Sequence, residues 1–147
     1  MNNRVFIFIL TISLIGYIYM FSQKDFAEES VVTKIIDGDT LIVQGGETIR
    51  LLGIDTDERG RKCYSEAKTR LDELVLGKKV ILEHDAEDRD RYGRLLRYMF
   101  LNGTNINALM VEEGLAVARF EGNQKYKGEI TALEKEAMER RTGCKWN

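Results

Sequence analysis

The chain has 147 residues, 31% of them charged and 44% hydrophobic, which is typical of one soluble globular domain. This balance excludes an intrinsically disordered chain, and the length is too short for two domains of ordinary size. The formal net charge is -2 at pH 7. A protein that attracts nucleic acid by its overall field is basic, so any such partner must be held by local positive charge.

The first 29 residues differ in composition from the rest. After Arg4, an apolar run of 17 residues covers 5–21, near the lower limit of roughly 17 to 25 residues for a bilayer span. We interpret 1–29 as a signal anchor followed by a polar, acidic linker that ends near Ser30, with a cleaved signal peptide as the alternative. Flanking charges predict that the domain at 30–147 is extracytoplasmic, either membrane-anchored or secreted.

From Val31 onward, alternating β-branched residues indicate strands, and apolar residues at helical spacing indicate helices. We expect strands at 31–36, 40–43, 48–54, 80–83 and 95–101, and helices at 64–76, 106–113 and 129–141. This order predicts a mainly β, α+β fold: the five-stranded barrel of an OB-fold with about three helices. Such barrels often bind oligonucleotides, but the fold alone does not define a function.

Two acidic turns carry the strongest chemical signal. Asp39 follows the first expected strand, and Asp55 and Thr56 close the third. Carboxylates and a backbone carbonyl are hard oxygen ligands that suit calcium or magnesium. A cation enclosed only in part could polarise a phosphoryl oxygen. Solvated turns are the alternative, because Asp and Gly are common turn formers.

Two arginines are candidates for phosphate binding, since a guanidinium matches phosphate oxygens in a bidentate way. They are Arg50 in the third expected strand and Arg94 before the fifth. Arg50 lies five positions before Asp55, so a bend near Gly53 is needed to bring both to one pocket. Glu58 is positioned to orient or deprotonate an attacking water.

Two further features have open alternatives. Tyr92 offers a ring to a nucleotide, and its neighbour Arg91 is expected either at the substrate or on a solvated face. Cys63 and Cys144 are expected to form a disulfide in an exported domain, unless they are two separate buried thiols.

Three motifs, at 36–40, 50–58 and 90–94, together resemble the staphylococcal nuclease family, and the likeness extends over about 32–146. The resemblance implies one Ca²⁺ held by Asp39, Asp55 and the backbone of Thr56. It also implies the catalytic residues Arg50, Glu58 and Arg94. The implied activity is that of an endonuclease that hydrolyses DNA and RNA as a monomer, releases the 5′ oxygen and leaves 3′-phosphates.

Two departures from the family pattern bear on the site. Asp57 stands where the family usually has proline, so its charge could tighten cation binding or misplace Glu58. The family tyrosine that stacks on the nucleotide has no clear match, and Phe120 could fill its place without the hydroxyl. A non-catalytic OB-fold module that binds nucleic acid or protein at the cell surface is the alternative function.

Overall fold

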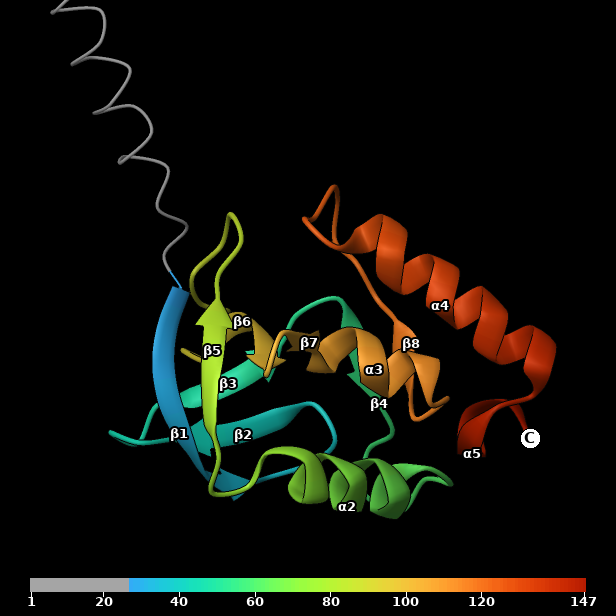
Figure 1. The fold of residues 1–147 in the computed structure, drawn as a ribbon, viewed down its shortest axis with the longest axis horizontal. Coiled ribbons are helices and arrows are strands. Elements are labelled where there is room, and N and C mark those ends of the chain that lie inside the picture. The colour runs from blue at the N-terminus through green and yellow to red at the C-terminus, as the bar shows by residue number, and fades with distance from the viewer. Residues whose placement is uncertain (1–26) are drawn as a thin grey trace, which may run out of the picture.

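Eight strands and four helices make up residues 27–147, the part of the chain that this computed structural model describes (Figure 1). The strands are β1 (Ala27–Ile35), β2 (Thr40–Val43), β3 (Thr48–Leu51), β4 (Ile54–Thr56), β5 (Lys79–Glu83), β6 (Leu95–Leu101), β7 (Thr104–Asn105) and β8 (Ala116–Ala118). The helices are α2 (Tyr64–Val75), α3 (Ile106–Glu112), α4 (Lys127–Arg140) and α5 (Gly143–Trp146). The predicted α+β class is therefore confirmed, with the four-residue α5 in addition to the three expected helices.

Five of the strands close into a barrel in the order β3-β2-β1-β5-β6. β1 is the long curved strand in Figure 1, and it pairs with β5 along 27–31 and with β2 from Val32 onward. Its register with β2 shifts between Val32 and Lys34, close to where it changes partner. A parallel pairing of β3 with β6 completes the ring. The predicted OB-fold barrel is thus confirmed, and its closure protects strand edges from further pairing.

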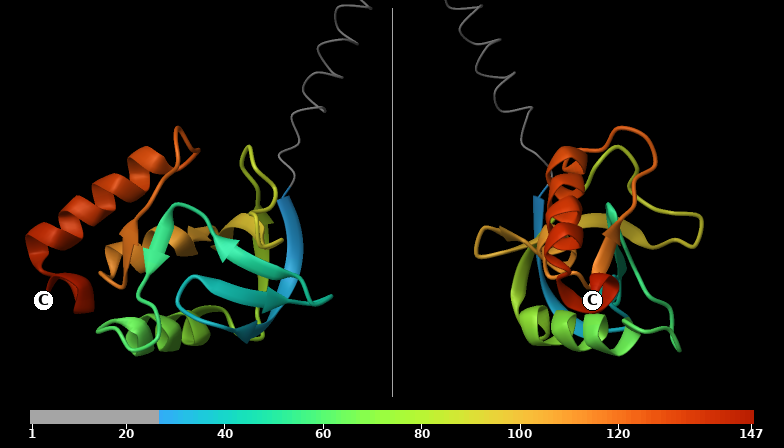
Figure 2. Two further views of the ribbon diagram at one scale, coloured as in Figure 1. Left: turned by 180° about the vertical axis from the view of Figure 1, so that it is seen from behind. Right: turned by 90° about the vertical axis from the view of Figure 1, so that its right-hand side faces the viewer.

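The barrel interior is filled by apolar side chains of its strands, including Leu41, Ile49 and Leu82, which are fully buried. Helix α2 covers one end of the barrel and contributes Ala67 and Leu71 at helical spacing. Figure 2 shows α4 on the other side of the molecule, where it packs against α3 and β8. Burial of such side chains stabilises the fold by roughly 1.5 to 3 kcal/mol each.

Three departures from the expected elements concern strand bounds and strand pairing. β1 begins at Ala27 rather than Val31, because 27–30 find hydrogen-bonding partners on β5. The expected strand 48–54 is divided into β3 and β4 by a bend at Gly53, whose φ of +73° favours glycine. β8 was not expected, and it pairs with β4 in a small separate sheet.

The predicted signal anchor lies outside the described residues. Within 27–147, no helix has the length and apolar character that crossing a bilayer requires. Cys63, directly before α2, and Cys144 in α5 are joined by a disulfide, with their Cα atoms 5.5 Å apart. The two cysteines are therefore paired and are not separate thiols.

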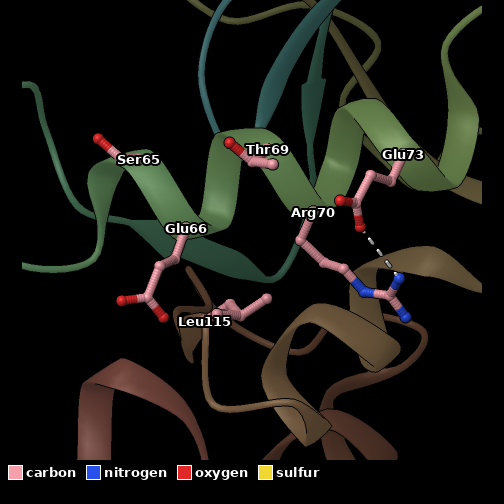
Figure 3. A pocket seen from close by; sticks show the side chains of 6 residues that line it. All are labelled: Ser65, Glu66, Thr69, Arg70, Glu73 and Leu115. Carbon is pink, nitrogen blue, oxygen red and sulfur yellow. Dashed lines mark ion pairs between the residues drawn. The ribbon is translucent and has the colours of Figure 1, made fainter.

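A shallow groove of about 390 Å³ lies between α2 and the start of β8 (Figure 3). It is lined by Ser65, Glu66, Thr69, Arg70, Glu73 and Leu115. Arg70 donates two hydrogen bonds to the Glu113 carboxylate, at 2.7 and 2.6 Å, and so bridges α2 and the end of α3. None of the candidate site residues lines this groove.

Candidate active site

Asp39 is a buried carboxylate immediately before β2, with 6% of its surface exposed. Its Oδ2 accepts hydrogen bonds from the backbone N–H and the hydroxyl of Thr56, at 2.8 and 3.0 Å. Its Oδ1 accepts one from the Thr40 hydroxyl and lies 3.3 Å from Nε of Arg50. Burial raises the pKa of Asp39, and the charge of Arg50 and the Thr56 hydrogen bonds oppose the rise. A buried anion of this kind depends on nearby positive charge.

The turn that presents Asp39 packs tightly against its neighbours. A Cβ on Gly38 would lie 2.7 Å from Cβ of Ala67 in α2 and 2.9 Å from Cγ2 of Thr56 in β4. Asp37 accepts a hydrogen bond from the backbone N–H of Asp39 at 3.1 Å. The lack of a side chain at Gly38 therefore allows the close approach, and Asp37 shapes the turn.

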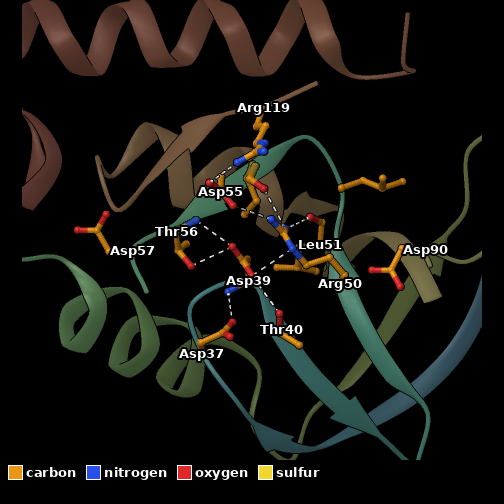
Figure 4. A network of polar contacts seen from close by, with 12 residues as sticks. Asp37, Asp39, Thr40, Arg50, Leu51, Asp55, Thr56, Asp57, Asp90 and Arg119 are labelled. Carbon is orange, nitrogen blue, oxygen red and sulfur yellow. Dashed lines mark hydrogen bonds and ion pairs between the residues drawn. The ribbon is translucent and has the colours of Figure 1, made fainter. Parts of the chain in front are cut away.

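Arg50 lies between the two predicted metal ligands and bonds to both (Figure 4). Its Nη2 is 2.9 Å from Oδ1 of Asp55, while Nε faces Asp39. Nη1 donates to the carbonyls of Leu51 and Ile54, at 2.6 and 2.9 Å, on either side of the bend. The expected bend thus brings Arg50 and Asp55 together. With Thr56, the three charged residues form one acid–arginine cluster.

The bend is held by Asn107, a fully buried residue at the start of α3. Its Nδ2 donates to the carbonyls of Leu52 and Arg97, at 2.8 and 3.2 Å. Its Oδ1 accepts from the N–H of Met99 at 3.0 Å. One amide side chain therefore ties the backbone behind the cluster to β6 and α3.

Arg119 is a residue of this region that the sequence motifs did not indicate. Its Nη1 lies 3.0 Å from Oδ2 of Asp55, while about two thirds of its side chain stays exposed. Its backbone N–H donates to the Gly53 carbonyl at 2.9 Å, and the ring of Phe120 covers Gly53 closely. The contact follows from the pairing of β8 with β4, for which no local sequence signal exists.

Arg94 lies apart from the cluster, on the loop between β5 and β6. Its Nε donates to Oδ2 of Asp90 at 2.7 Å, and no hydrogen bond or ion pair within residues 27–147 joins it to the cluster. Burial raises the pKa of Asp90, but hydrogen bonds from Arg94 and the loop backbone outweigh this, so the net shift is downward. Tyr92 is 68% exposed, with the guanidinium carbons of Arg91 and Arg94 at 4.8 and 5.4 Å from its ring centre.

Glu58 is exposed on the loop 57–63 between β4 and α2. In the described part of the chain its carboxylate takes part in no hydrogen bond or ion pair, so it is open to an incoming group. Its neighbour Asp57 is directed away from Asp39 (Figure 4) and contacts Lys145, with 2.5 Å between Oδ1 and Nζ. The charge of Asp57 is therefore matched by a lysine outside the cluster.

The donor set at the cluster bears on the predicted calcium site. Asp39 and Asp55 offer two carboxylates, the hard donors that Ca²⁺ and Mg²⁺ prefer. Among residues 27–147, no group of three or more His, Cys, Asp or Glu side chains is placed to hold a metal ion. The residues present therefore fit only a partly enclosed hard cation, with most of its ligands drawn from water and substrate.

The fold and the cluster together define an OB-fold protein with a buried carboxylate–guanidinium site at the bend of its barrel. The model of the family described as staphylococcal nuclease homologue matches residues 48–147. The chain is 33% identical to the thermonuclease of Staphylococcus intermedius, covering 91% of this chain and 92% of that protein. It is 36% identical to the thermonuclease of Staphylococcus hyicus, covering 73% and 69%. It is 39% identical to endonuclease YncB of Bacillus subtilis, covering 71% and 55%.

The chain therefore belongs to the staphylococcal nuclease family, as its three motifs predicted. It is an enzyme of the nuclease class, which hydrolyses phosphodiester bonds.

Proposed function

We propose that the protein is a calcium-dependent endonuclease that cleaves DNA and RNA and leaves 3′-phosphates. One observation carries the proposal: the Arg50 guanidinium bonds at once to the buried carboxylate of Asp39 and to Asp55. This arrangement gathers two hard anionic donors and a bidentate phosphate-binding group at one bend of the barrel. The two relatives named thermonuclease support the nuclease part of this proposal.

In the proposed reaction, water attacks phosphorus in line with the departing 5′ oxygen. Glu58 accepts a proton from the water as the new P–O bond forms. The bond between phosphorus and the 5′ oxygen then breaks, and this oxygen keeps the electron pair and takes a proton from solvent. The products are a 3′-phosphate and a 5′-hydroxyl. The exposure of Glu58 supports this role, because the carboxylate is open to a bound substrate.

The arginines stabilise the charge that develops on the phosphoryl oxygens. Arg50 acts from the cluster, where its orientation is set before substrate arrives. Arg94 acts from the loop between β5 and β6, and it must exchange its bond to Asp90 for one to phosphate. Arg91 and the exposed ring of Tyr92 bind the nucleotide beside it.

Asp39, Asp55 and the backbone of Thr56 would hold the calcium ion. When bound, the ion would polarise a phosphoryl oxygen and neutralise part of its charge. The burial of Asp39 supports this assignment, because a buried carboxylate is stabilised by nearby positive charge.

Cleavage of supercoiled plasmid by the full-length protein tests the proposal. We expect cleavage with Ca²⁺, loss of cleavage with a chelator, and a fall in turnover of about 100-fold or more for Glu58→Gln. Glu139→Gln, on the exposed face of α4, serves as the matched control. Full turnover by Glu58→Gln would remove its catalytic role, and cleavage that persists in chelator would remove the calcium requirement. Binding without cleavage would favour the alternative of a binding module.

We also infer that the domain functions outside the cytoplasm, membrane-anchored or secreted. The Cys63–Cys144 disulfide supports this, because disulfides persist in oxidising compartments. Mass spectrometry of the amino-terminus of cell-derived protein would distinguish a retained anchor from a cleaved signal. A cytoplasmic protein with free thiols would contradict the inference.

A further inference from the structure

The loop that carries Glu58 is fastened to the carboxy-terminal end of the chain. It contains no proline, and Gly60 at its middle has a φ of +88°, so its own backbone provides little stiffness. Three contacts nevertheless join this loop to 144–147: the Cys63–Cys144 disulfide, the Asp57–Lys145 ion pair, and a hydrogen bond from Lys62 Nζ to the Asn147 carbonyl.

The ion pair holds both ends of the loop through one carboxylate. Asp57, the first residue of the loop, bonds through Oδ1 to Lys145, and their side chains are only 22% and 16% exposed. Its Oδ2 accepts a hydrogen bond at 2.9 Å from the backbone N–H of Cys63, the last residue of the loop. The hydrogen bonds from Lys145 and from Cys63 hold the pKa of Asp57 below its usual value. The carboxylate therefore stays ionised near neutral pH.

The segment that holds the loop is itself fixed to the rest of the fold. The backbone N–H of Lys145 donates to the carbonyl of Gly114 at 3.0 Å. At this point the turn before α5 meets the turn after α3 so closely that a Cβ on Gly114 would lie 1.9 Å from the Thr142 carbonyl oxygen. Movement of α5 would therefore require movement of α3 as well.

We propose that Asp57 and Lys145, together with the Cys63–Cys144 disulfide, are positioning residues that hold Glu58 in its productive place. Glu58 lies next to Asp57 in a loop that has both ends bound to α5. This inference rests on the proposed catalytic role of Glu58. Loss of the ion pair should increase the mobility of the Glu58 carboxylate. A displacement of a catalytic group by about 1 Å is enough to lower the rate up to 100-fold.

The test compares Lys145→Gln in two backgrounds, the wild-type chain and Glu58→Gln. We expect Lys145→Gln alone to lower kcat about 10-fold, with KM unchanged within about twofold. In the Glu58→Gln background the same change should lower single-turnover cleavage by less than about twofold, because no catalytic carboxylate is left to misplace. Arg140→Gln, which breaks an exposed ion pair on α4, is the control and should leave kcat unchanged.

The exchange Asp57→Lys with Lys145→Asp restores the ion pair in reverse but not the hydrogen bond from the Cys63 N–H, so it should recover only part of the lost kcat. An equal slowing by Lys145→Gln in both backgrounds would overturn the inference, since it would mean that the residue acts on the whole fold. Full turnover of Lys145→Gln, with Glu58→Gln inactive, would overturn the inference but leave the proposed function standing. Full turnover of Glu58→Gln would overturn both. Melting temperatures of all variants check that each is folded.

Discussion

The acid–arginine cluster and the Glu58 loop are adjacent in the chain but are stabilised in different ways. The cluster is built into the barrel: Asp39 is buried, Arg50 contacts two carboxylates and two carbonyls, and Asn107 holds the backbone behind them. The loop is exposed, and its contacts to Cys144, Lys145 and Asn147 come from the far end of the chain.

The difference reflects what each part has to do. Charges that must be in place before substrate arrives are best fixed by a buried network, where reorganisation is small. A base that must meet both water and substrate has to lie at the surface. Surface loops are mobile unless something holds them. A short surface loop that carries a catalytic group therefore needs its own contacts to the rest of the fold to keep that group in place.

Arg50→Lys is expected to have the largest effect, and it tests the cluster. Lysine keeps the charge but cannot contact Asp39, Asp55 and the carbonyls of the bend together. We expect kcat/KM to fall about 10³-fold, roughly 4 kcal/mol of transition-state stabilisation. Single-turnover cleavage measures it, with the exposed Arg140→Lys as control. A loss below about 10-fold would show that Arg50 only supports the structure.

Removal of the disulfide tests how much the contacts of the Glu58 loop add to the free energy of unfolding. A covalent bond between residues 81 positions apart lowers the entropy of the unfolded chain, and this stabilises the fold by about 4.5 kcal/mol on the loop-entropy model. We expect the double variant Cys63→Ser with Cys144→Ser to unfold at a lower urea concentration. Its free energy of unfolding, obtained from the urea curve, should be lower by about the same amount. Reduced wild-type protein should match it. A shift below about 1 kcal/mol in both would contradict the expectation.

The sequence predicted the cluster because its residues lie within 20 positions and on elements with strong local signals. Asp39 and Asp55 lie at the ends of strands that alternate clearly, Arg50 lies within one of these strands, and Gly53 marked the bend that brings Arg50 and Asp55 together. The charge of Asp57 was expected to tighten cation binding or to misplace Glu58, and the sequence did not indicate that Lys145 binds it away from the cluster.

The contacts that the sequence did not predict join segments far apart in the chain. Arg119 reaches Asp55 through the pairing of β8 with β4, and Lys145 reaches Asp57 across 88 positions. A single sequence carries local spacing, and it gives little information on which distant segments pair.

Asn107→Ala is expected to have a smaller effect than removal of the disulfide. It tests whether the cluster depends on the buried hydrogen bonds of Asn107. The change leaves the carbonyl of Leu52 and the N–H of Met99 without their side-chain partner. We expect a loss of about 3 kcal/mol in the free energy of unfolding, since each buried polar group left unpaired costs about 1 to 3 kcal/mol. Urea unfolding measures it, and Asn123→Ala, at an exposed position, is the control. An equal, small effect of both changes would show that Asn107 is dispensable.

Arg119→Ala should have the smallest effect, because this residue belongs fully neither to the acid–arginine cluster nor to the Glu58 loop. It contacts the cluster through Asp55, but most of its side chain faces solvent, where an ion pair contributes at most about 1 kcal/mol. Its exposed positive charge attracts the phosphate backbone, so we expect KM to rise about fivefold with kcat nearly unchanged. Arg119→Lys keeps the charge and should recover most of the lost affinity, and the difference between variants should shrink at high salt. A fall in kcat instead would place Arg119 with the cluster that acts on the reacting phosphate. The exposed residue Arg119 would then belong with the buried cluster, and burial would no longer separate the two parts of the site.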